Sequence, residues 1–201
     1  MSAPLPVGRA HVAALVDALA SLDDDVDRIG AWGEHLADVL GAGGRLLAAG
    51  NGGSAAQAQH LTSELVGRYR DERTPFSAIS LHVEGSSVTA LANDYGYAEV
   101  YARQVRAHGR PGDVLVALST SGRSPNAVAA VAAARQTGMT AWALTGPAPN
   151  PLATRADDAV CVGATATATI QEVHQVVVHL LCAAVDVAVG ASAAQLLEGA
   201  R

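Results

Sequence analysis

The chain has 201 residues, half of them hydrophobic, and its formal net charge at pH 7 is −6. This length suits one well-buried domain, and the acidic balance argues against a nucleic-acid-binding surface, which would show as a basic patch or run. Aromatic residues make up only 3% of the chain, while Ala and Val abound, a mix that favours helices packed closely on a parallel sheet.

The cysteines and the apolar runs bear on the compartment. Cys161 and Cys182 lie far apart in apolar segments and form no C-x-x-C pair, which predicts buried free thiols in a reducing compartment. The N-terminus lacks the basic start and unbroken apolar core of a signal peptide. The apolar run 176–191 is interrupted by His179 and Asp186 and is too short for a membrane span. We therefore expect a soluble, cytoplasmic protein that does not bind membranes.

The N-terminal part, residues 1–43, is predicted to be helical. Apolar residues recur at helical spacing over 7–29, where Gly30 is expected to end a helix, and a second helix runs to about Leu40 before the glycines of 41–44. Both helices precede the first strand signal, so their apolar faces need a partner. A symmetric contact between subunits is a natural one.

Residues 44–201 complete a single domain and alternate between two patterns. Short apolar runs without period-2 alternation predict buried strands at 45–49, 76–81, 113–118, 140–145 and 158–162. Helical patterns lie between them, near 54–69, 86–92, 96–108, 125–137 and 149–155, and a long one follows near 168–190. This alternation predicts a doubly wound α/β sheet with helices on both faces. Ligands bind such sheets beyond the carboxyl ends of the strands.

A hydroxyl-rich turn follows the strand predicted at 113–118. Ser124 is placed to cap the next helix and Pro125 sits at its first position. Such a turn aims backbone N–H groups and the positive end of a helix dipole at one point, and hydroxyls are added there by Ser119, Thr120, Ser121 and Ser124. The segment therefore suits a phosphate. The alternative is a serine-rich loop with a good helix cap.

A second loop of the same design follows the strand predicted at 45–49. It reads Gly50-Asn51-Gly52-Gly53-Ser54, and Ser54 is expected to cap the helix that follows. Because both loops end strands of one parallel sheet, they can face one pocket.

Two helices carry residues with ligand chemistry. His60 and Glu64 are four apart and share a helix face, and Gln171 and His179, eight apart, point roughly the same way. Two imidazoles, a carboxylate and an amide oxygen are a plausible ligand set for zinc or a similar divalent ion. The alternatives are a solvated polar face for the first pair and a satisfied core histidine for His179.

Two further groups of polar residues lie between these two pairs in the sequence, at 68–73 and at 93–96. Asn93-Asp94-Tyr95-Gly96 is a turn signal in which Asp94 could cap the following helix or bind sugar hydroxyls. A loose basic cluster is formed by Arg68, Arg70 and Arg73. We expect it on the solvated surface, where Arg68 could draw in an anionic substrate.

Together these residues resemble the sugar isomerase (SIS) domain family, and within it the phosphoheptose isomerases. The resemblance covers nearly the whole chain. The matching stretches are 50–60 with Glu64, 92–96, 119–124, and 170–174 with His179. The serine loop alone indicates the broad family, whereas the Asn-Gly-Gly-Ser helix with His60 and Glu64 and the Ile-Gln-Glu helix are specific to the subgroup.

The resemblance implies a flavodoxin-like three-layer αβα sandwich with a five-stranded parallel sheet, assembled as a homotetramer with active sites at subunit interfaces. It implies conversion of sedoheptulose 7-phosphate to D-glycero-D-manno-heptose 7-phosphate through an enediol, with Glu64 moving the proton between C1 and C2 and His179 as acid/base partner. One zinc ion per site would be held by His60, Glu64, Gln171 and His179. The phosphate would be bound by Ser119, Thr120, Ser121 and Ser124, and the sugar by Asn51, Gly52, Gly53, Ser54, Glu64, Asn93, Asp94 and Gln171.

The chain departs from the family pattern at two places. The family commonly shows an Asp and an Arg before Ile-Gln-Glu, whereas residues 164–169 read Ala-Thr-Ala-Thr-Ala-Thr, and Arg123 stands where the family often has Asn. The loss of two charges leaves other sugar phosphates open as substrates. Some relatives are protein-binding scaffolds or sugar-phosphate sensors, and these remain alternatives to the enzyme.

Overall fold

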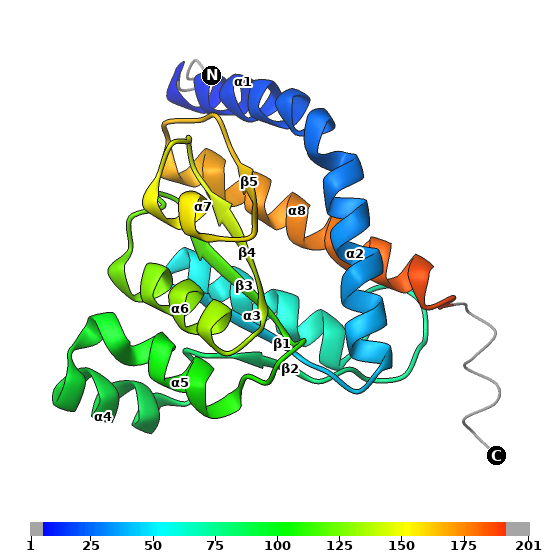
Figure 1. The fold of residues 1–201 in the computed structure, drawn as a ribbon. Helices are drawn as coiled ribbons and strands as arrows, with labels where there is room; N and C mark the ends of the chain where they lie inside the picture. Colours follow the sequence, from blue (N-terminus) through cyan, green and yellow to red (C-terminus); the bar gives the residue numbers. More distant parts are fainter. Residues whose placement is uncertain (1–5, 192–201) are drawn as a thin grey trace.

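A five-stranded parallel sheet forms the centre of the computed structural model, which describes residues 6–191 (Figure 1). The strand order is β2-β1-β3-β4-β5, the order of flavodoxin-like sheets, so that predicted fold class is confirmed. The strands are β1 (Leu46–Gly50), β2 (Ala78–Ser80), β3 (Val114–Ser119), β4 (Thr140–Thr145) and β5 (Asp158–Cys161). The three central ones are almost wholly buried, as their unbroken apolar runs predict.

Helices cover both faces of the sheet, because alternate strand residues point to opposite faces. Leu46 and Ala48 of β1 face a core shared with α2 (Val26–Gly41), α3 (Gly53–Val66) and α8 (Thr167–Ala188). Leu47 and Ala49 face the opposite core, beneath α5 (Val100–His108) and α6 (Pro125–Gln136). The other elements after β1 are α4 (Gly85–Tyr95), the short 3-10 helix η2 (Tyr97–Glu99) and α7 (Pro151–Arg155).

The chain before the sheet folds differently from the predicted helix over 7–29. It forms α1 (Pro6–Ala20), the 3-10 turn η1 (Ser21–Asp25) and then α2, which continues through Gly30. The predicted end at Gly30 is wrong because α2 buries Ile29 and Trp32 on either side of it, and this packing outweighs the low helix propensity of glycine. Trp32 stacks on Trp142 of β4, with ring centroids 4.7 Å apart.

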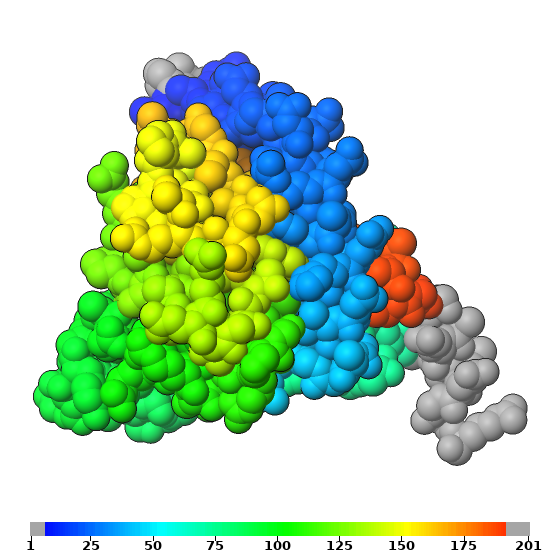
Figure 2. Space-filling model, in the orientation of Figure 1, coloured from blue at the N-terminus to red at the C-terminus, as the bar shows by residue number. Residues whose placement is uncertain are grey.

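Helix α1 lies across one end of the molecule, and its surface adjoins that of the rest of the domain (Figure 2). Leu15 and Leu19 pack against the core beside α8, while Val12 and Val16, one turn apart on another face, are each 59% exposed. This apolar face keeps the expectation of a subunit contact open. The ends of the predicted N-terminal part and of the domain, residues 1–5 and 192–201, lie outside the described residues.

Helix α8 is long and apolar enough to cross a membrane by length and composition alone. Half of its most apolar 18-residue window is buried inside the molecule, and its inward faces carry His174 and Asp186. These are the properties of a core helix, packed between α2 and α3.

Candidate active site

The two Gly/Ser loops lie at the same edge of the sheet, as predicted. The loop after β1 and the loop after β3 follow neighbouring strands that pair in parallel, with Gly50 opposite Leu118. This is where the strand order reverses, the usual place for a ligand in such sheets. A reciprocal amide pair joins the two loops: Asn51 Nδ2 donates to Asn126 Oδ1 at 2.9 Å, and Asn126 Nδ2 donates to Asn51 Oδ1 at 2.8 Å.

The loop after β3 gathers its hydroxyl groups at the start of α6. Ser119 Oγ lies 3.0 Å from Ser124 Oγ and 3.5 Å from Ser121 Oγ. Ser121 Oγ also accepts from the backbone N–H of Arg123 at 3.2 Å. Ser121 is exposed and Thr120 half-buried. Donors converging on a helix N-terminus form a cradle for an anion.

The backbone of this loop is held by the segment after β4, from Gly146 to the first turn of α7. The N–H of Gly146 donates to Thr120 O at 3.0 Å, and the N–H of Leu152 donates to Gly122 O at 2.9 Å. Gly122 has a φ of +59°, and a Cβ on it would lie 2.0 Å from Asn150 Oδ1. Only glycine fits such a position without displacing its neighbour.

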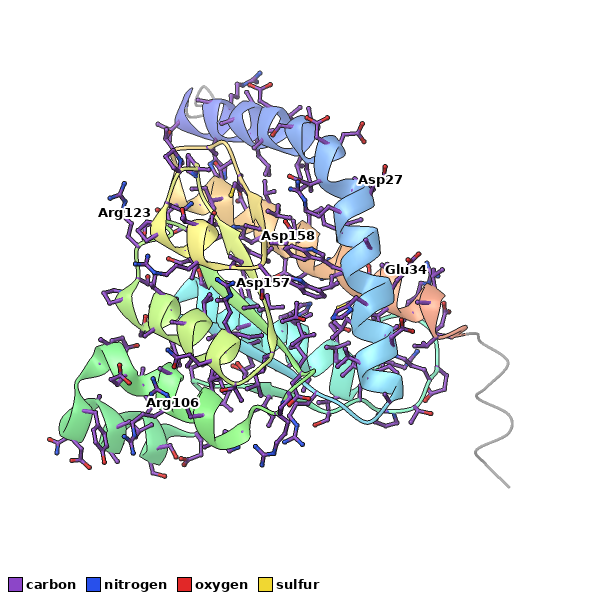
Figure 3. The ribbon with its side chains drawn as sticks, viewed as in Figure 1. Asp27, Glu34, Arg106, Arg123, Asp157 and Asp158 are labelled. Atoms are coloured by element: carbon purple, nitrogen blue, oxygen red, sulfur yellow. The ribbon has the colours of Figure 1, made fainter. Side chains whose placement is uncertain are left out.

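A hollow of about 390 Å³ adjoins the loop. It is lined on one side by Thr120, Ser121 and Arg123, and on the other by Thr165 and Thr167 at the start of α8. Figure 3 shows the Arg123 side chain on the outer side of the loop, pointing away from the sheet. Residues 164–169, which lead into α8, carry only small and hydroxyl side chains, and Arg123 is a cation at the rim of this hollow.

One of the two predicted helix caps is confirmed in position and the other is wrong. Ser124 occupies the N-cap of α6 with Pro125 next, as predicted, but its hydroxyl points to Ser119, and within residues 6–191 it makes no capping hydrogen bond. The N-cap of α3 is Gly52, with a φ of +54°, because the reversal of the chain there requires a left-handed residue. Ser54 is therefore a buried residue inside α3. Gly52 and Gly53 are exposed at the head of the helix.

Helices α3 and α8 bring His60, Glu64 and His179 together. The Nε2 atoms of His60 and His179 are 3.1 Å apart, and His60 Nε2 is 3.2 Å from Glu64 Oε1. One imidazole must carry the proton of the contact between the two rings. The side chain of His60 is 40% exposed and that of Glu64 18%, so the cluster is open to solvent or to a ligand. His179 is therefore more than a core histidine, and His60 and Glu64 are more than a solvated helix face.

Sequence reasoning placed Gln171 in this cluster, and the structure places Gln175 there. Gln175 Nε2 lies 3.1 Å from His179 Nε2. Gln171, one turn earlier on the same helix, lies against Gly53, where a Cβ would approach its amide nitrogen to 2.4 Å. Gln57 of α3 donates to the backbone carbonyl of Gln171. A second glutamine four residues after Gln171 was the available signal for Gln175.

The cluster has the chemistry of a zinc site but is not arranged as one. Within residues 6–191 no three His, Cys, Asp or Glu side chains are positioned to hold a metal ion. The donor atoms nevertheless match zinc in kind, and nitrogen ligands at about 2.0–2.1 Å in a tetrahedron lie ~3.3 Å apart, close to the separation of the two imidazole nitrogens. The residues therefore fit the ion in the kind of donor and in the spacing of the two nitrogens.

Asn93 and Asp94 lie at the exposed end of α4. Of the two alternatives for Asp94, the helix cap is wrong because α4 runs through Tyr95, and the chain turns only at Gly96, with a φ of +83°. Asn93 Nδ2 donates to Asp94 Oδ1 at 2.9 Å. This corner reaches the first loop through Tyr97, whose hydroxyl donates to Asn51 Oδ1 at 3.1 Å. No sequence signal pointed to that tyrosine.

A buried histidine joins α8 to the sheet edge. His174 is fully buried, and its Nε2 lies 3.1 Å from the carbonyl of Thr145 at the end of β4. Its Nδ1 has no hydrogen-bond partner in the described part of the chain. Burial lowers the pKa of His174 from 6.5 to about 4, so the ring is neutral at pH 7. Both cysteines are free thiols, and burial raises the pKa of Cys182 to about 12.

Comparison with known proteins gives consistent results. The SIS domain matches residues 10–146. A phosphoheptose isomerase of Streptomyces coelicolor is 68% identical over 157 residues, which cover 78% of this chain and 68% of that protein. The structure of a phosphoheptose isomerase from Neisseria gonorrhoeae aligns with a TM-score of 0.82 at 38% identity, covering 89% of this chain and 96% of that one.

A second solved relative extends the match. The structure of a phosphoheptose isomerase from Francisella tularensis aligns with a TM-score of 0.86 at 32% identity, over 92% of this chain and 99% of that chain. The likeness therefore extends over nearly the whole chain.

Proposed function

Because the chain belongs to the SIS domain family, in its phosphoheptose isomerase subgroup, we propose that it converts sedoheptulose 7-phosphate to D-glycero-D-manno-heptose 7-phosphate. The observation that carries the proposal is the cluster of His60, Glu64 and His179, on helices that begin beside a hydroxyl-rich loop. In this cluster His60 Nε2 lies 3.1 Å from His179 Nε2 and 3.2 Å from Glu64 Oε1. The reaction moves one hydrogen between adjacent carbons. It therefore needs a base, a proton carrier for the oxygens, and a grip on the far end of the substrate.

The loop after β3 binds the phosphate in this proposal. The hydroxyls of Ser119, Thr120, Ser121 and Ser124 and the N-terminus of α6 supply the donors, and Arg123 adds a positive charge at the rim. Binding energy gained at the phosphate positions the reacting end. The sugar lies between the phosphate site and the reacting end. In this proposal it is lined by Asn51, Gly52, Gly53, Asn93, Asp94 and Gln171.

Glu64 is the base that moves the carbon-bound proton. Its carboxylate takes a proton from C1 of the ketose, the electron pair of that C–H bond forms the C1–C2 double bond of the enediol, and the same carboxyl returns the proton to C2. His60 Nε2, 3.2 Å from Glu64 Oε1, orients the carboxylate. Substitution of a general base of this kind costs about 10²–10⁴ in rate.

His179 carries the proton between the two oxygens. The carbonyl at O2 must gain a proton as the hydroxyl at O1 loses one, and an imidazole can do both near neutral pH. Its Nε2 contacts His60 and Gln175, which fix the ring beside the carboxylate.

Zinc is the cofactor that these residues fit. His60, Glu64 and His179 would hold it, with Gln171 as the fourth ligand implied by the family and Gln175 as the amide nearest to His179 in this structure. When bound, the ion supplies positive charge that stabilises the developing negative charge on the substrate oxygens.

The proposal includes a cytoplasmic homotetramer whose active sites lie at subunit interfaces. Support comes from the exposed apolar face of α1, where Val12 and Val16 are each 59% exposed, and from the 40% exposure of His60, which a second subunit would cover. Sedimentation velocity at several concentrations measures the assembly directly.

The proposed function is tested by an isomerisation assay on sedoheptulose 7-phosphate with chelator-treated and zinc-restored protein. We expect aldose formation that zinc restores. Turnover of pentose or hexose phosphates in place of the heptose would change the substrate. Binding of a sugar phosphate without turnover by either form would instead support the sensor or scaffold alternative.

A further inference from the structure

A buried ion pair lies between the two helices that carry the cluster. Arg73, in the segment after α3, donates from Nε to Asp186 Oδ1 of α8 at 2.9 Å, and the two side chains are only 3% and 5% exposed. The backbone N–H of Arg70 lies 3.5 Å from Asp186 Oδ2, and the Arg73 guanidinium stands 4.8 Å from the ring centre of Phe76. The expectation that Arg73 lies on the solvated surface is therefore wrong.

The guanidinium also binds the last turn of α3. Arg73 Nη1 donates to the carbonyl of Leu65 at 2.9 Å, and Nη2 donates to the backbone carbonyl of Glu64 at 2.6 Å. Carbonyls in the last turn of a helix lack partners within the helix, and a planar fork with five donors can satisfy several of them at once. Arg73 thus contacts the backbone of the proposed catalytic base.

Asp186 has a matching relation to His179. The two residues are seven apart on α8, close to two full turns, and so lie on nearly the same face. At the other end of the contact between the helices, Gln57 of α3 donates to the carbonyl of Gln171 of α8. The cluster of His60, Glu64 and His179 therefore lies between two polar links that join α3 to α8.

Burial of this ion pair is not explained by stability alone. Taking two charges out of water is costly, and replacing a buried pair by apolar side chains of similar volume is often neutral or stabilising. Apolar neighbours are available here, since the adjoining core of α3 and α8 is formed by residues such as Leu65, Leu181 and Val185. What an apolar pair cannot do is fix the helices through directed hydrogen bonds.

We propose that Arg73 and Asp186 are positioning residues, which hold α3 and α8 in the register that brings His60 and Glu64 to His179. This inference rests on the proposed function, because it assigns the pair to the geometry of the zinc-binding and proton-transferring cluster. It predicts that removal of the ion pair disturbs the positions of the cluster's side chains. The phosphate loop, which is built on β3 and α6, should keep its structure.

The test compares three variants with the wild type. Asp186→Asn keeps the shape and removes the charge, Arg73→Met/Asp186→Leu replaces the pair by apolar side chains, and Asp113→Asn is the matched control. Asp113 is also a buried carboxylate that binds an arginine and two backbone N–H groups, but its partners are Arg45 and Arg110, on neither α3 nor α8. The readouts are zinc affinity by competition with a chelating dye, thermal midpoint, and kcat and KM measured separately.

We expect Asp186→Asn and the apolar double variant to bind zinc about tenfold more weakly or worse, with a similar fall in kcat and a KM within about twofold of wild type. Asp113→Asn should lower the thermal midpoint while zinc affinity stays within about twofold. Wild-type zinc affinity in both pair variants, or an equal loss of affinity in Asp113→Asn at matched stability, would overturn the inference.

A crystal structure of the double variant separates this inference from the proposed function. We expect the Nε2 atoms of His60 and His179 to move out of hydrogen-bonding reach, whatever the protein turns over. An unchanged contact of about 3.1 Å would overturn the positioning role even in an active enzyme. A widened contact in a protein that neither binds zinc nor isomerises heptose phosphate would refute the proposed function alone.

Discussion

The loop after β3 and the cluster between α3 and α8 are built on opposite principles. The loop is shaped by its backbone, through the bonds from Gly146 to Thr120 and from Leu152 to Gly122 and through a glycine that no other residue can replace without displacing Asn150. The cluster consists of side-chain atoms from two helices, with a half-exposed histidine at its centre.

This difference assigns the two regions different tasks. A loop fixed by the sheet and its neighbours is preformed for an anion and changes little when a ligand binds. A cluster of side chains depends on how two helices sit against each other, so it is sensitive to changes far from its own atoms. Changes in the loop should therefore affect binding of the phosphate, and changes in or under the cluster should affect turnover.

The largest effect is expected at the cluster. In Glu64→Gln the carboxylate that takes the proton is lost, so kcat should fall by at least about a hundredfold, while the thermal midpoint changes little. Steady-state kinetics with zinc-restored protein measure this. Glu34→Gln, an exposed carboxylate on α2 (Figure 3), is the matched control and should keep wild-type turnover. Turnover within tenfold of wild type in Glu64→Gln would remove Glu64 from the chemistry.

Buried His174, which joins α8 to the end of β4, should make the free energy of unfolding depend on pH. The pKa of His174 is about 4 in the folded protein and 6.5 as its ordinary value, so the unfolded chain takes up a proton that the folded chain does not. Stability is complete above pH 6.5 and is lost as the pH falls towards 4, by about 3 kcal/mol in all. Denaturant unfolding across this range measures the slope.

The control for the pH effect is a histidine at the surface. His174→Gln should lose this part of the pH dependence, whereas His108→Gln, at the exposed end of α5, should keep it. An equal slope in His174→Gln and wild type would assign the acid sensitivity to other groups.

The loop's dependence on backbone shape is tested by Gly122→Ala. A Cβ there meets Asn150 Oδ1 at a positive φ, and we expect a loss of about 2 kcal/mol together with a raised KM. Gly112→Ala is the control, since Gly112 has a φ of +88° and no described atom lies within 4 Å of its added Cβ. It should cost the backbone strain alone and leave KM unchanged. A KM unaffected by Gly122→Ala would mean that the loop need not keep this shape.

The smallest effect is expected from one hydroxyl of the loop. Ser121→Ala removes an exposed donor and should raise the KM of the sugar phosphate about tenfold, because a hydrogen bond to a charged group contributes about 1.5 kcal/mol or more. Its kcat should stay near wild type. Ser77→Ala, an exposed serine before β2, controls for the loss of a hydroxyl elsewhere. A fall in kcat at constant KM would instead place Ser121 at the chemistry.

The sheet and the meeting of its two loops could be predicted from the sequence. Unbroken apolar runs ending in Gly50 and Ser119 identify strands whose carboxyl ends share an edge, whatever the details of packing. The two loops could be placed together on that ground alone. The cap of α6, Ser124, could also be predicted. The cap of α3 could not, since Gly52 rather than Ser54 is its N-cap owing to the positive φ that the turn requires there.

Contacts between distant residues escaped prediction for a physical reason. Arg73 follows a helix among polar neighbours, and a charged residue there is normally solvated; it is buried because Asp186, 113 positions later, meets it. Gln175 and Gln171 share one helix face, and the choice between them depends on how α8 is rotated against Gly53. Tertiary packing decides both.

The central claim is that the phosphate and the chemistry belong to different regions, and one measurement tests it most directly. Inorganic phosphate is titrated calorimetrically into Glu64→Gln and Ser121→Ala. We expect Glu64→Gln to bind phosphate within about twofold of wild type and Ser121→Ala to bind it about tenfold more weakly. Lost phosphate binding in Glu64→Gln, with Ser121→Ala unaffected, would contradict the account by placing the anion at the cluster between α3 and α8.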